Sequence, residues 1–190
     1  VPVFRGLLIE VFVLIAIGAA VRVMNAGLAC PDWPLCFGDF IPDYHPQVFL
    51  EFIHRAMAGI IALMMAGLSY LILFRSQAPR KFKALTVFAC ALLLTQVIFG
   101  GLTVILKLQS YVVATHLTMG TGFFAILTWM YMSLRKSSKD QTQPTQLMKI
   151  SSSIMLAGIF GQIILGGLVA SHYAALVCTD FPTCHGQWFP

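Results

Sequence analysis

Five long apolar stretches constrain the fold of this chain more than any other feature of its sequence. A membrane-spanning helix needs roughly 20 consecutive, mostly apolar residues. Five stretches meet that length, at residues 4–24, 52–74, 84–106, 111–134 and 149–171. Because 58% of the residues are hydrophobic and only 10% are charged, a soluble domain of this size could not bury them. The sequence therefore predicts an all-α integral membrane protein.

Lysine and arginine are distributed unevenly over the segments that join these stretches. Cytoplasmic loops of membrane proteins carry an excess of both residues. Nine of the twelve fall at one end of the predicted helices: Arg5, Arg75, Arg80, Lys81, Lys83, Arg135, Lys136, Lys139 and Lys149. We therefore expect a cytoplasmic N-terminus, two cytoplasmic basic loops and two outer segments that carry cysteines. The net charge of +5 is explained by this topology and by anionic membrane lipid, so no nucleic acid partner is expected.

A polar connection divides the predicted helices into two groups. Residues 137–146 read SSKDQTQPTQ and form the one low-complexity stretch of the chain. We place a boundary there. Residues 1–134 are then a four-helix transmembrane bundle, residues 135–148 a cytoplasmic loop, and residues 149–190 a fifth helix with an outer loop.

The fifth helix and its outer loop repeat the first helix and the loop that follows it. At an offset of 148 residues, Gly27–Pro42 matches Ala175–Pro190, and the Cys, Asp, Pro, Cys, Gly and Pro positions coincide. Repeats in membrane proteins come as whole bundles. We therefore expect the fifth helix to begin a second, pseudo-symmetric bundle, and we expect this chain to be a fragment that contains only the start of it.

Two histidines lie on predicted helices at similar depth near the outer face. His54 is in the first turns of the second helix and His116 is about two turns into the fourth, and both helices start outside. Imidazoles that face each other across a helix bundle can bind a heme iron from both sides. Histidines that only pack between helices are the alternative. The matched depth favours a pair of heme iron ligands, and no other metal site is predicted.

Three charged residues accompany the histidines. Glu51 precedes His54 by three residues and Arg55 by four, which places the side chains on adjoining faces of one helix. Glu51 is interpreted as the partner of Arg55 or as a proton-handling group, and it is our candidate catalytic residue. Arg22 and Arg55 lie near outer helix ends, where a guanidinium can pair with a heme propionate. Snorkelling toward lipid phosphate is the alternative for both.

Four of the five cysteines form two Cys-x5-Cys pairs, Cys30/Cys36 and Cys178/Cys184. If both pairs face an oxidising outer compartment, structural disulfides are favoured. A redox-active role stays open, because a short strained bridge is more easily reduced.

Taken together, these segments resemble the heme A synthase family. The resemblance rests on RVMNAGLACPDWPLCFGDFIP from Arg22 to Pro42, on Glu51-Phe-Ile-His54-Arg55, on Gly-Gly-Leu-Thr from Gly100, on His116 and on the closing residues 166–190. It spans nearly the whole chain. The cysteine loop followed at this distance by Glu-x-x-His-Arg is far more specific than a pair of histidines alone.

The resemblance implies an eight-helix bacterial inner-membrane protein of two pseudo-symmetric halves. Such a protein oxidises a ring methyl of heme O to the formyl group of heme A, for the assembly of terminal oxidases. The half that contains His54 and His116 would bind heme O as substrate, with Glu51 near the reacting methyl. A second histidine pair, on helices that would follow Pro190, would hold heme B. Heme O synthase and an electron acceptor are the implied partners.

Two other functions remain open at this stage. A b-type cytochrome that only carries electrons would also use paired helix-borne histidines. A membrane thiol oxidase would use the outer cysteine pairs, although it would more naturally carry Cys-x-x-Cys and would not need His54 or His116.

Overall fold

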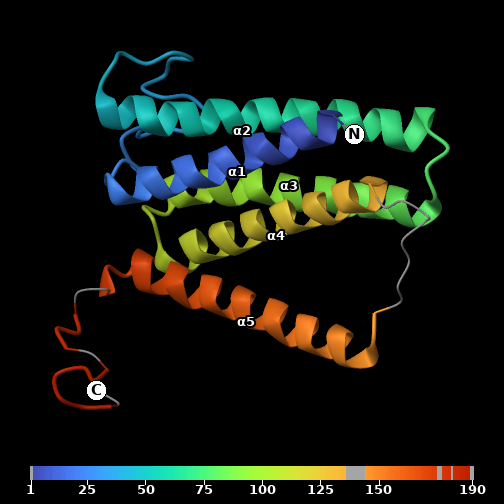
Figure 1. Cartoon of the computed structure of the whole chain (residues 1–190). Helices are drawn as coiled ribbons and strands as arrows, with labels where there is room; N and C mark the ends of the chain where they lie inside the picture. The colour runs from blue at the N-terminus through green and yellow to red at the C-terminus, as the bar shows by residue number, and fades with distance from the viewer. Residues whose placement is uncertain (1, 136–143, 175–176, 181, 189–190) are drawn as a thin grey trace.

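The chain forms five long helices that run roughly along one direction (Figure 1). The computed structural model describes residues 2–135, 144–174, 177–180 and 182–188. Within these ranges the helices are α1 (Pro2–Val23), α2 (Pro46–Tyr70) with the π-helical turn η1 (Leu71–Arg75), α3 (Arg80–Ile105), α4 (Ser110–Arg135) and α5 (Gln146–Ser171). Each is long and apolar enough to cross a membrane, with η1 counted as the end of the second span. The predicted all-α membrane fold is confirmed.

Several helices extend beyond the apolar stretches that predict them. The second begins at Pro46 rather than near residue 52, and the third at Arg80 rather than near residue 84. Proline suits the first turn of a helix, because its missing N–H would have no partner there. Hydropathy identifies only the part of a helix that lies in the hydrocarbon core, so it does not predict the turns that extend beyond that core. As a result Glu51 lies in the second turn of α2.

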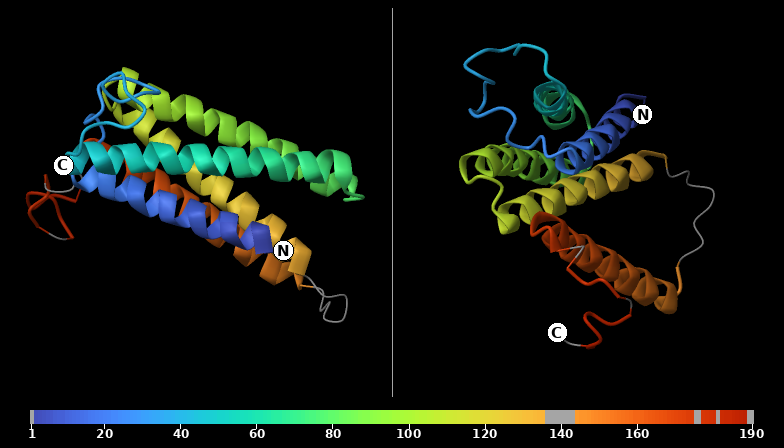
Figure 2. Two further views of the ribbon diagram at one scale, coloured as in Figure 1. Left: turned by 90° about the horizontal axis from the view of Figure 1, so that it is seen from above. Right: turned by 90° about the vertical axis from the view of Figure 1, so that its left-hand side faces the viewer.

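Helices α1 to α4 pack as a bundle and α5 lies against its side (Figures 1 and 2). In the described part of the chain, α1 packs against α2 and α4, α3 packs against α2 and α4, and α5 packs against α4. The fully buried side chains at the bundle centre include Leu7, Ile61, Met65, Leu127 and Met130. A Cβ at Gly167 of α5 would sit only 3.6 Å from the α4 backbone, at the Cα of Ala114. A glycine there lets the two helices approach closely.

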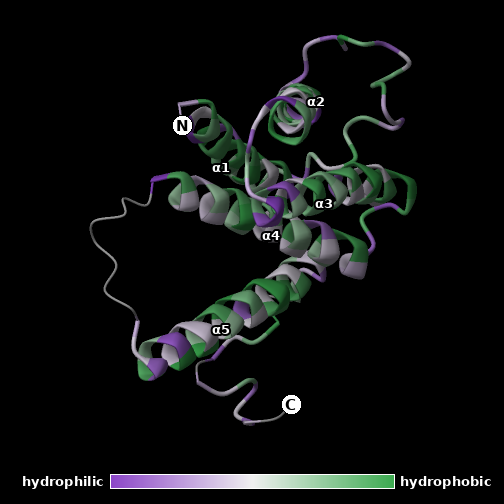
Figure 3. Cartoon of the chain, turned by 90° about the vertical axis from the view of Figure 1, so that its right-hand side faces the viewer, coloured by the Kyte–Doolittle hydropathy of each residue, from purple (hydrophilic) through white to green (hydrophobic). Residues whose placement is uncertain are grey.

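Hydrophobic residues predominate along the helices, with a minority of hydrophilic turns (Figure 3). Large hydrophobic side chains are widely exposed on the helices, among them Leu63 at 76%, Trp129 at 69% and Met155 at 68%. Single exposed apolar residues are normal in soluble proteins, but continuous coverage of long helices is not. The chain is therefore a multi-pass membrane protein.

The loops separate into two groups at opposite ends of the bundle (Figure 1). The N-terminus and the turn between η1 and α3 lie at one end, and both cysteine loops lie at the other. The basic residues of the first end include Arg75, Arg80 and Arg135, whereas Lys136 and Lys139 fall outside the described residues. Most of the predicted loop 135–148 also falls outside them. Helix α5 is capped by Thr145, whose side chain accepts a hydrogen bond from Met148 N at 3.3 Å.

Candidate functional site

His54 of α2 and His116 of α4 each face a glycine of a neighbouring helix. A Cβ at Gly18 of α1 would lie 3.0 Å from His54 Cε1, and a Cβ at Gly100 of α3 would lie 3.5 Å from His116 Cε1. Each imidazole therefore rests where a neighbouring helix has no side chain. His54 thus lies against α1 and His116 against α3, so all four helices of the bundle contribute to the surroundings of the two imidazoles.

The surroundings of this pair fit a metal-bound macrocycle. Nδ1 of His54 is buried and has no hydrogen-bond partner among the described residues. A buried polar atom without a partner costs about 1–3 kcal/mol, so such an atom indicates a missing ligand or partner. The described residues contain no group of three or more His, Cys, Asp and Glu side chains that could hold a metal ion. A heme needs only two protein ligands, because its ring supplies four.

Gln96 of α3 contacts His116 directly. Its carboxamide, oriented by the hydrogen-bond network, donates to His116 Nδ1 at 3.2 Å and to His116 O at 3.0 Å. The carboxamide oxygen accepts from Gly120 N at 3.2 Å. A Cβ at Gly120 would sit 3.1 Å from the carboxamide, so glycine makes room for it. Sequence reasoning did not select Gln96, although an uncharged polar side chain inside a spanning helix is a signal for interhelical bonding.

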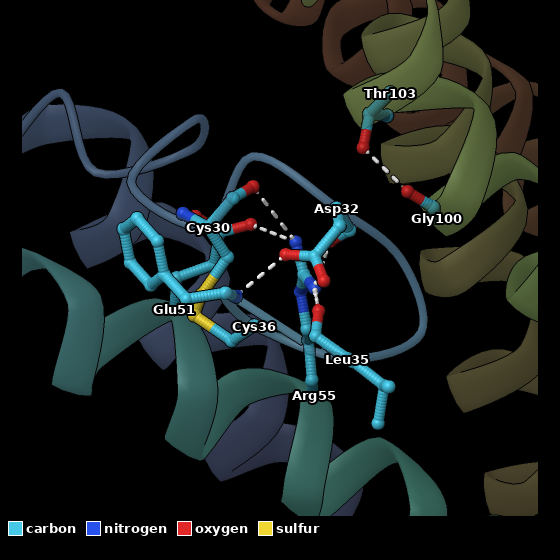
Figure 4. Close-up of polar contacts among 9 residues, drawn as sticks. Cys30, Asp32, Leu35, Cys36, Glu51, Arg55, Gly100 and Thr103 are labelled. Carbon is cyan, nitrogen blue, oxygen red and sulfur yellow. Dashed lines mark hydrogen bonds and ion pairs between the residues drawn. A yellow bond between two sulfur atoms is a disulfide. The ribbon is translucent and has the colours of Figure 1, made fainter. Parts of the chain in front are cut away.

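Glu51 and Arg55 hold the first cysteine loop onto the start of α2 (Figure 4). Glu51 is 4% exposed; its Oε2 accepts from Cys30 N at 2.9 Å and its Oε1 pairs with Arg55. The other terminal nitrogen of Arg55 donates to the carbonyl oxygens of Asp32 and Leu35, each at 2.7 Å. The structure thus brings Glu51 to the loop as well as to the helix turn that carries His54.

The loop has an internal framework of its own. Cys30 and Cys36 are joined with an S–S distance of 2.02 Å. The Asp32 carboxylate accepts from the backbone N–H groups of Phe37 at 2.6 Å and Gly38 at 2.8 Å. The N–H of Gly38 is the largest of the contacts that lower the pKa of this exposed carboxyl below its ordinary value of 3.8. Phe37 and Gly38 have φ angles of 57° and 79°, which the carboxylate stabilises by bonding both amides.

Trp33 extends this loop across the outer end of the bundle. A Cβ at Gly101 of α3 would lie 3.1 Å from Cδ2 and 3.2 Å from Cε2 of the indole. Gly101 is adjacent to Gly100, which His116 contacts. The indole therefore covers α3 next to the glycine that faces His116, and no sequence pattern indicates this contact.

A small cavity of about 260 Å³ lies on the outer side of the histidines. Its lining includes Arg22, Lys107, Val113, Ser171 and Tyr173. Arg22 donates to the Ala170 carbonyl, and its Cζ lies 3.9 Å from the centre of the Tyr173 ring. Val113 precedes His116 by about one helical turn, so the cavity lies outward of the histidines. Of the three basic residues at this end of the bundle, Arg22 and Lys107 line this cavity, whereas Arg55 does not.

The second cysteine pair is also bonded, and the remaining histidines lie apart from the site. Cys178 and Cys184 have an S–S distance of 2.09 Å. His45 precedes α2 in an extended conformation, His172 ends α5, and His185 lies in the second cysteine loop; all three are exposed. They do not join His54 and His116. Cys90 Sγ contacts Ser69 Oγ at 2.9 Å inside the bundle.

Comparison with known proteins gives a consistent set of similarities. The family COX15-CtaA, described as cytochrome oxidase assembly protein, matches residues 4–48 and 41–190. A heme A synthase of Shewanella oneidensis is 33% identical over 97% of this chain and 61% of its own length. Heme A synthases of Shouchella clausii and Alkalihalophilus pseudofirmus are 27% and 26% identical, over 91% and 96% of this chain and 60% and 63% of their own lengths. The chain spans less than two thirds of each of these relatives.

Proposed function

The chain belongs to the COX15-CtaA family of cytochrome oxidase assembly proteins, and we propose that it is part of a heme A synthase, an oxidoreductase that converts a ring methyl of heme O to the formyl group of heme A. The observation that carries this proposal is that His54 and His116, on two helices of one bundle, each lie against a glycine of a neighbouring helix. Relatives named heme A synthase support the reaction class.

In this proposal His54 and His116 are the two protein ligands of the substrate iron. Nδ1 of His116 is engaged by Gln96, so Nε2 would be the iron ligand, and it would have to give up its proton to bind. When bound, the heme supplies the methyl group that is oxidised and the iron that holds the ring in register. The glycines at 18 and 100 leave the rings without a covering side chain.

We assign the propionates to Arg22, with Lys107 as a second cation on the same cavity. Guanidinium and ammonium groups there can pair with carboxylates at the outer end of the site. Arg55 was the other candidate from the sequence. Both of its terminal nitrogens are already bonded, to Glu51 and to loop carbonyls, so we assign Arg55 to holding the loop.

Glu51 is proposed to act at the reacting methyl through its charge. Its carboxylate is held by an ion pair with Arg55 and by a hydrogen bond from Cys30 N. A fixed negative charge one turn from His54 would stabilise a cation that develops on the ring edge, or accept a proton released there. The cysteine loop and Trp33 would exclude water from that edge.

The wider setting follows the same proposal. Positive charge at the end that carries the N-terminus supports a cytoplasmic N-terminus and outer cysteine loops in a bacterial inner membrane. Heme B is proposed for a second histidine pair, which the described residues do not contain. Heme O synthase, as the source of substrate, and an electron acceptor are the proposed partners.

Pigment analysis of the full-length protein tests the function. The protein is expressed in a host that makes heme O but no heme A, and extracted hemes are separated by chromatography. We expect heme A with the unaltered protein and none with His54→Ala or His116→Ala. A heme that stays bound and unmodified would instead indicate a b-type electron carrier. Thiol oxidation without any bound heme would indicate a membrane thiol oxidase.

Glu51→Gln separates the charge of Glu51 from its role as a loop anchor. The amide oxygen of glutamine can still accept from Cys30 N, but the negative charge is lost. We expect heme O to bind and heme A formation to fall by about 100-fold or more, as for loss of one stabilising electrostatic group. Undiminished conversion would reject the catalytic role and leave Glu51 as an anchor.

A further inference from the structure

The contact between Gln96 and His116 restricts which nitrogen of the imidazole carries the proton. An amide N–H that donates to Nδ1 needs a lone pair on Nδ1. A neutral imidazole has a single N–H, so the proton then resides on Nε2. Nδ1 of His116 therefore accepts from Gln96 in the described structure, at 3.2 Å.

This arrangement is the reverse of what a strong iron ligand needs. A ligating histidine usually binds metal through one nitrogen and donates the other N–H to an acceptor, which makes the ligand more basic. Turning the Gln96 carboxamide by half a rotation would offer its oxygen to Nδ1. The same turn would place that oxygen against the His116 carbonyl oxygen and the NH₂ group against the Gly120 N–H, because both lie within 3.2 Å of the carboxamide. Like groups would then face each other at two positions.

His54 is in a different situation. Its buried Nδ1 has no hydrogen-bond partner within the described ranges, so no side chain there donates to that nitrogen. The two histidines of the pair are thus unequal, although the sequence alone presents them as equivalent.

We propose that Gln96 is a positioning residue that makes His116 the weaker and more readily released iron ligand of the pair. This inference rests on the proposed function. A heme that is a substrate must leave after conversion, whereas a permanent cofactor need not. A ligand held in the tautomer that does not bind iron lowers the barrier to release, and His54 keeps the ring in place until then.

The test compares Gln96→Met with a matched control in the full-length protein loaded with heme O. Methionine keeps the bulk of the side chain and removes the amide. The control is Gln77→Met in the turn between η1 and α3, because Gln77 is exposed and lies at the end of the bundle opposite to the cysteine loops. The rate of heme O transfer to apomyoglobin is measured, and the released heme is identified by chromatography. We expect release to slow by about 10-fold in Gln96→Met, the lower end for a changed neighbour of a metal ligand, and to stay unchanged in the control.

A spectroscopic measurement on the heme-free protein checks the cause. The ¹⁵N signals of His116 are expected to report the Nε2–H tautomer in the unaltered protein and a shift toward Nδ1–H in Gln96→Met. A wild-type release rate in Gln96→Met, faster release in that variant, or an Nδ1–H tautomer in the unaltered protein would each overturn the inference. Failure of the proposed function looks different, because heme O would then bind equally well to His116→Ala.

Discussion

The two cysteine loops have the same internal structure and different surroundings. Their Cα–Cα distances across the disulfide are 4.8 and 4.7 Å. Asp180 accepts from His185 N at 2.6 Å and Gly186 N at 2.9 Å, as Asp32 does from the N–H groups of Phe37 and Gly38. Positive φ angles recur at the matching positions, 57° and 79° against 51° and 74°. The repeated sequence therefore encodes the loop conformation locally.

The difference lies in what holds each loop. Glu51, Arg55 and Gly101 fix the first loop to α2 and α3, and Cys30 is completely buried. Within the described part of the chain the second loop has no contact of this kind, and Cys178 is exposed. A short motif can thus determine the shape of a loop, while tertiary contacts determine whether that shape serves a site.

Removing Arg55 should have the largest effect on this difference. Arg55→Met leaves the buried Glu51 carboxylate without its ion-pair partner, and we expect a loss of about 3–5 kcal/mol in the free energy of unfolding. Denaturant unfolding in detergent micelles measures it. The double variant Glu51→Met/Arg55→Met should recover most of the loss, because an apolar pair removes the unpaired charge. Equal losses of unfolding free energy in both variants would mean that Arg55 stabilises the protein through its hydrogen bonds to the loop carbonyls and not through its ion pair with Glu51.

A methyl group on α3 should disturb the first loop alone. In Gly101→Ala the new Cβ would lie 3.1 Å from Trp33, so the indole or the helix must shift. We expect a loss of about 1–3 kcal/mol, as for an overpacked core. Gly67→Ala is the control, because nothing lies within 4 Å of a Cβ there, and its better helix propensity should stabilise slightly. An unchanged free energy of unfolding in Gly101→Ala would show that Trp33 does not pack against α3.

The local parts of this structure are the parts that sequence predicts. The apolar stretches predict all five helices because lipid solvates them along their whole length, and the spacing of Cys30 and Cys36 predicts a closed loop. The contacts of Gln96 with His116 and of Trp33 with Gly101 depend on how α3 packs against α4 and against the loop. No periodicity within one segment encodes such a contact. The start of α2 at Pro46 was not predicted for a different reason, because hydropathy marks only the part of a helix that lies in the hydrocarbon core.

The two disulfides should be reduced at different rates, because their sulfur atoms differ in exposure. Thiol attack requires approach to a sulfur, and Cys30 is buried whereas Cys178 is exposed. We expect Cys178–Cys184 to be reduced about 10-fold faster than Cys30–Cys36 by a membrane-impermeant phosphine. Alkylation after timed exposure, followed by mass spectrometry of the peptides, measures both rates in one sample. Equal reduction rates would mean that the contacts of the first loop with α2 and α3 do not protect Cys30–Cys36 from the reductant.

Acid should act on the two loops through their aspartates, with the smallest effect. The Gly38 N–H lowers the pKa of Asp32, and the Thr183 hydroxyl and Gly186 N–H lower that of Asp180. A lowered pKa in the folded state means that the stabilisation is complete above the ordinary value of 3.8 and is lost as the pH falls through the folded value. The amide signals of Gly38 and Gly186, followed by NMR from about pH 6 to about pH 2, should therefore move only in the acid range.

The same titration should affect the two loops differently. Acid weakens only the aspartate–amide hydrogen bonds, which both loops contain, and leaves the contacts between the first loop and Arg55 in place. Protonation of Asp180 should loosen the second loop, so that the Gly186 signal broadens. The first loop should keep its shape when Asp32 is protonated, since Arg55 still bonds the carbonyls of Asp32 and Leu35. Asp32→Asn and Asp180→Asn should reproduce these two results at neutral pH. If both loops loosen in parallel, the aspartates alone maintain the conformation, and the contacts with α2 serve only to place the loop over the histidine pair.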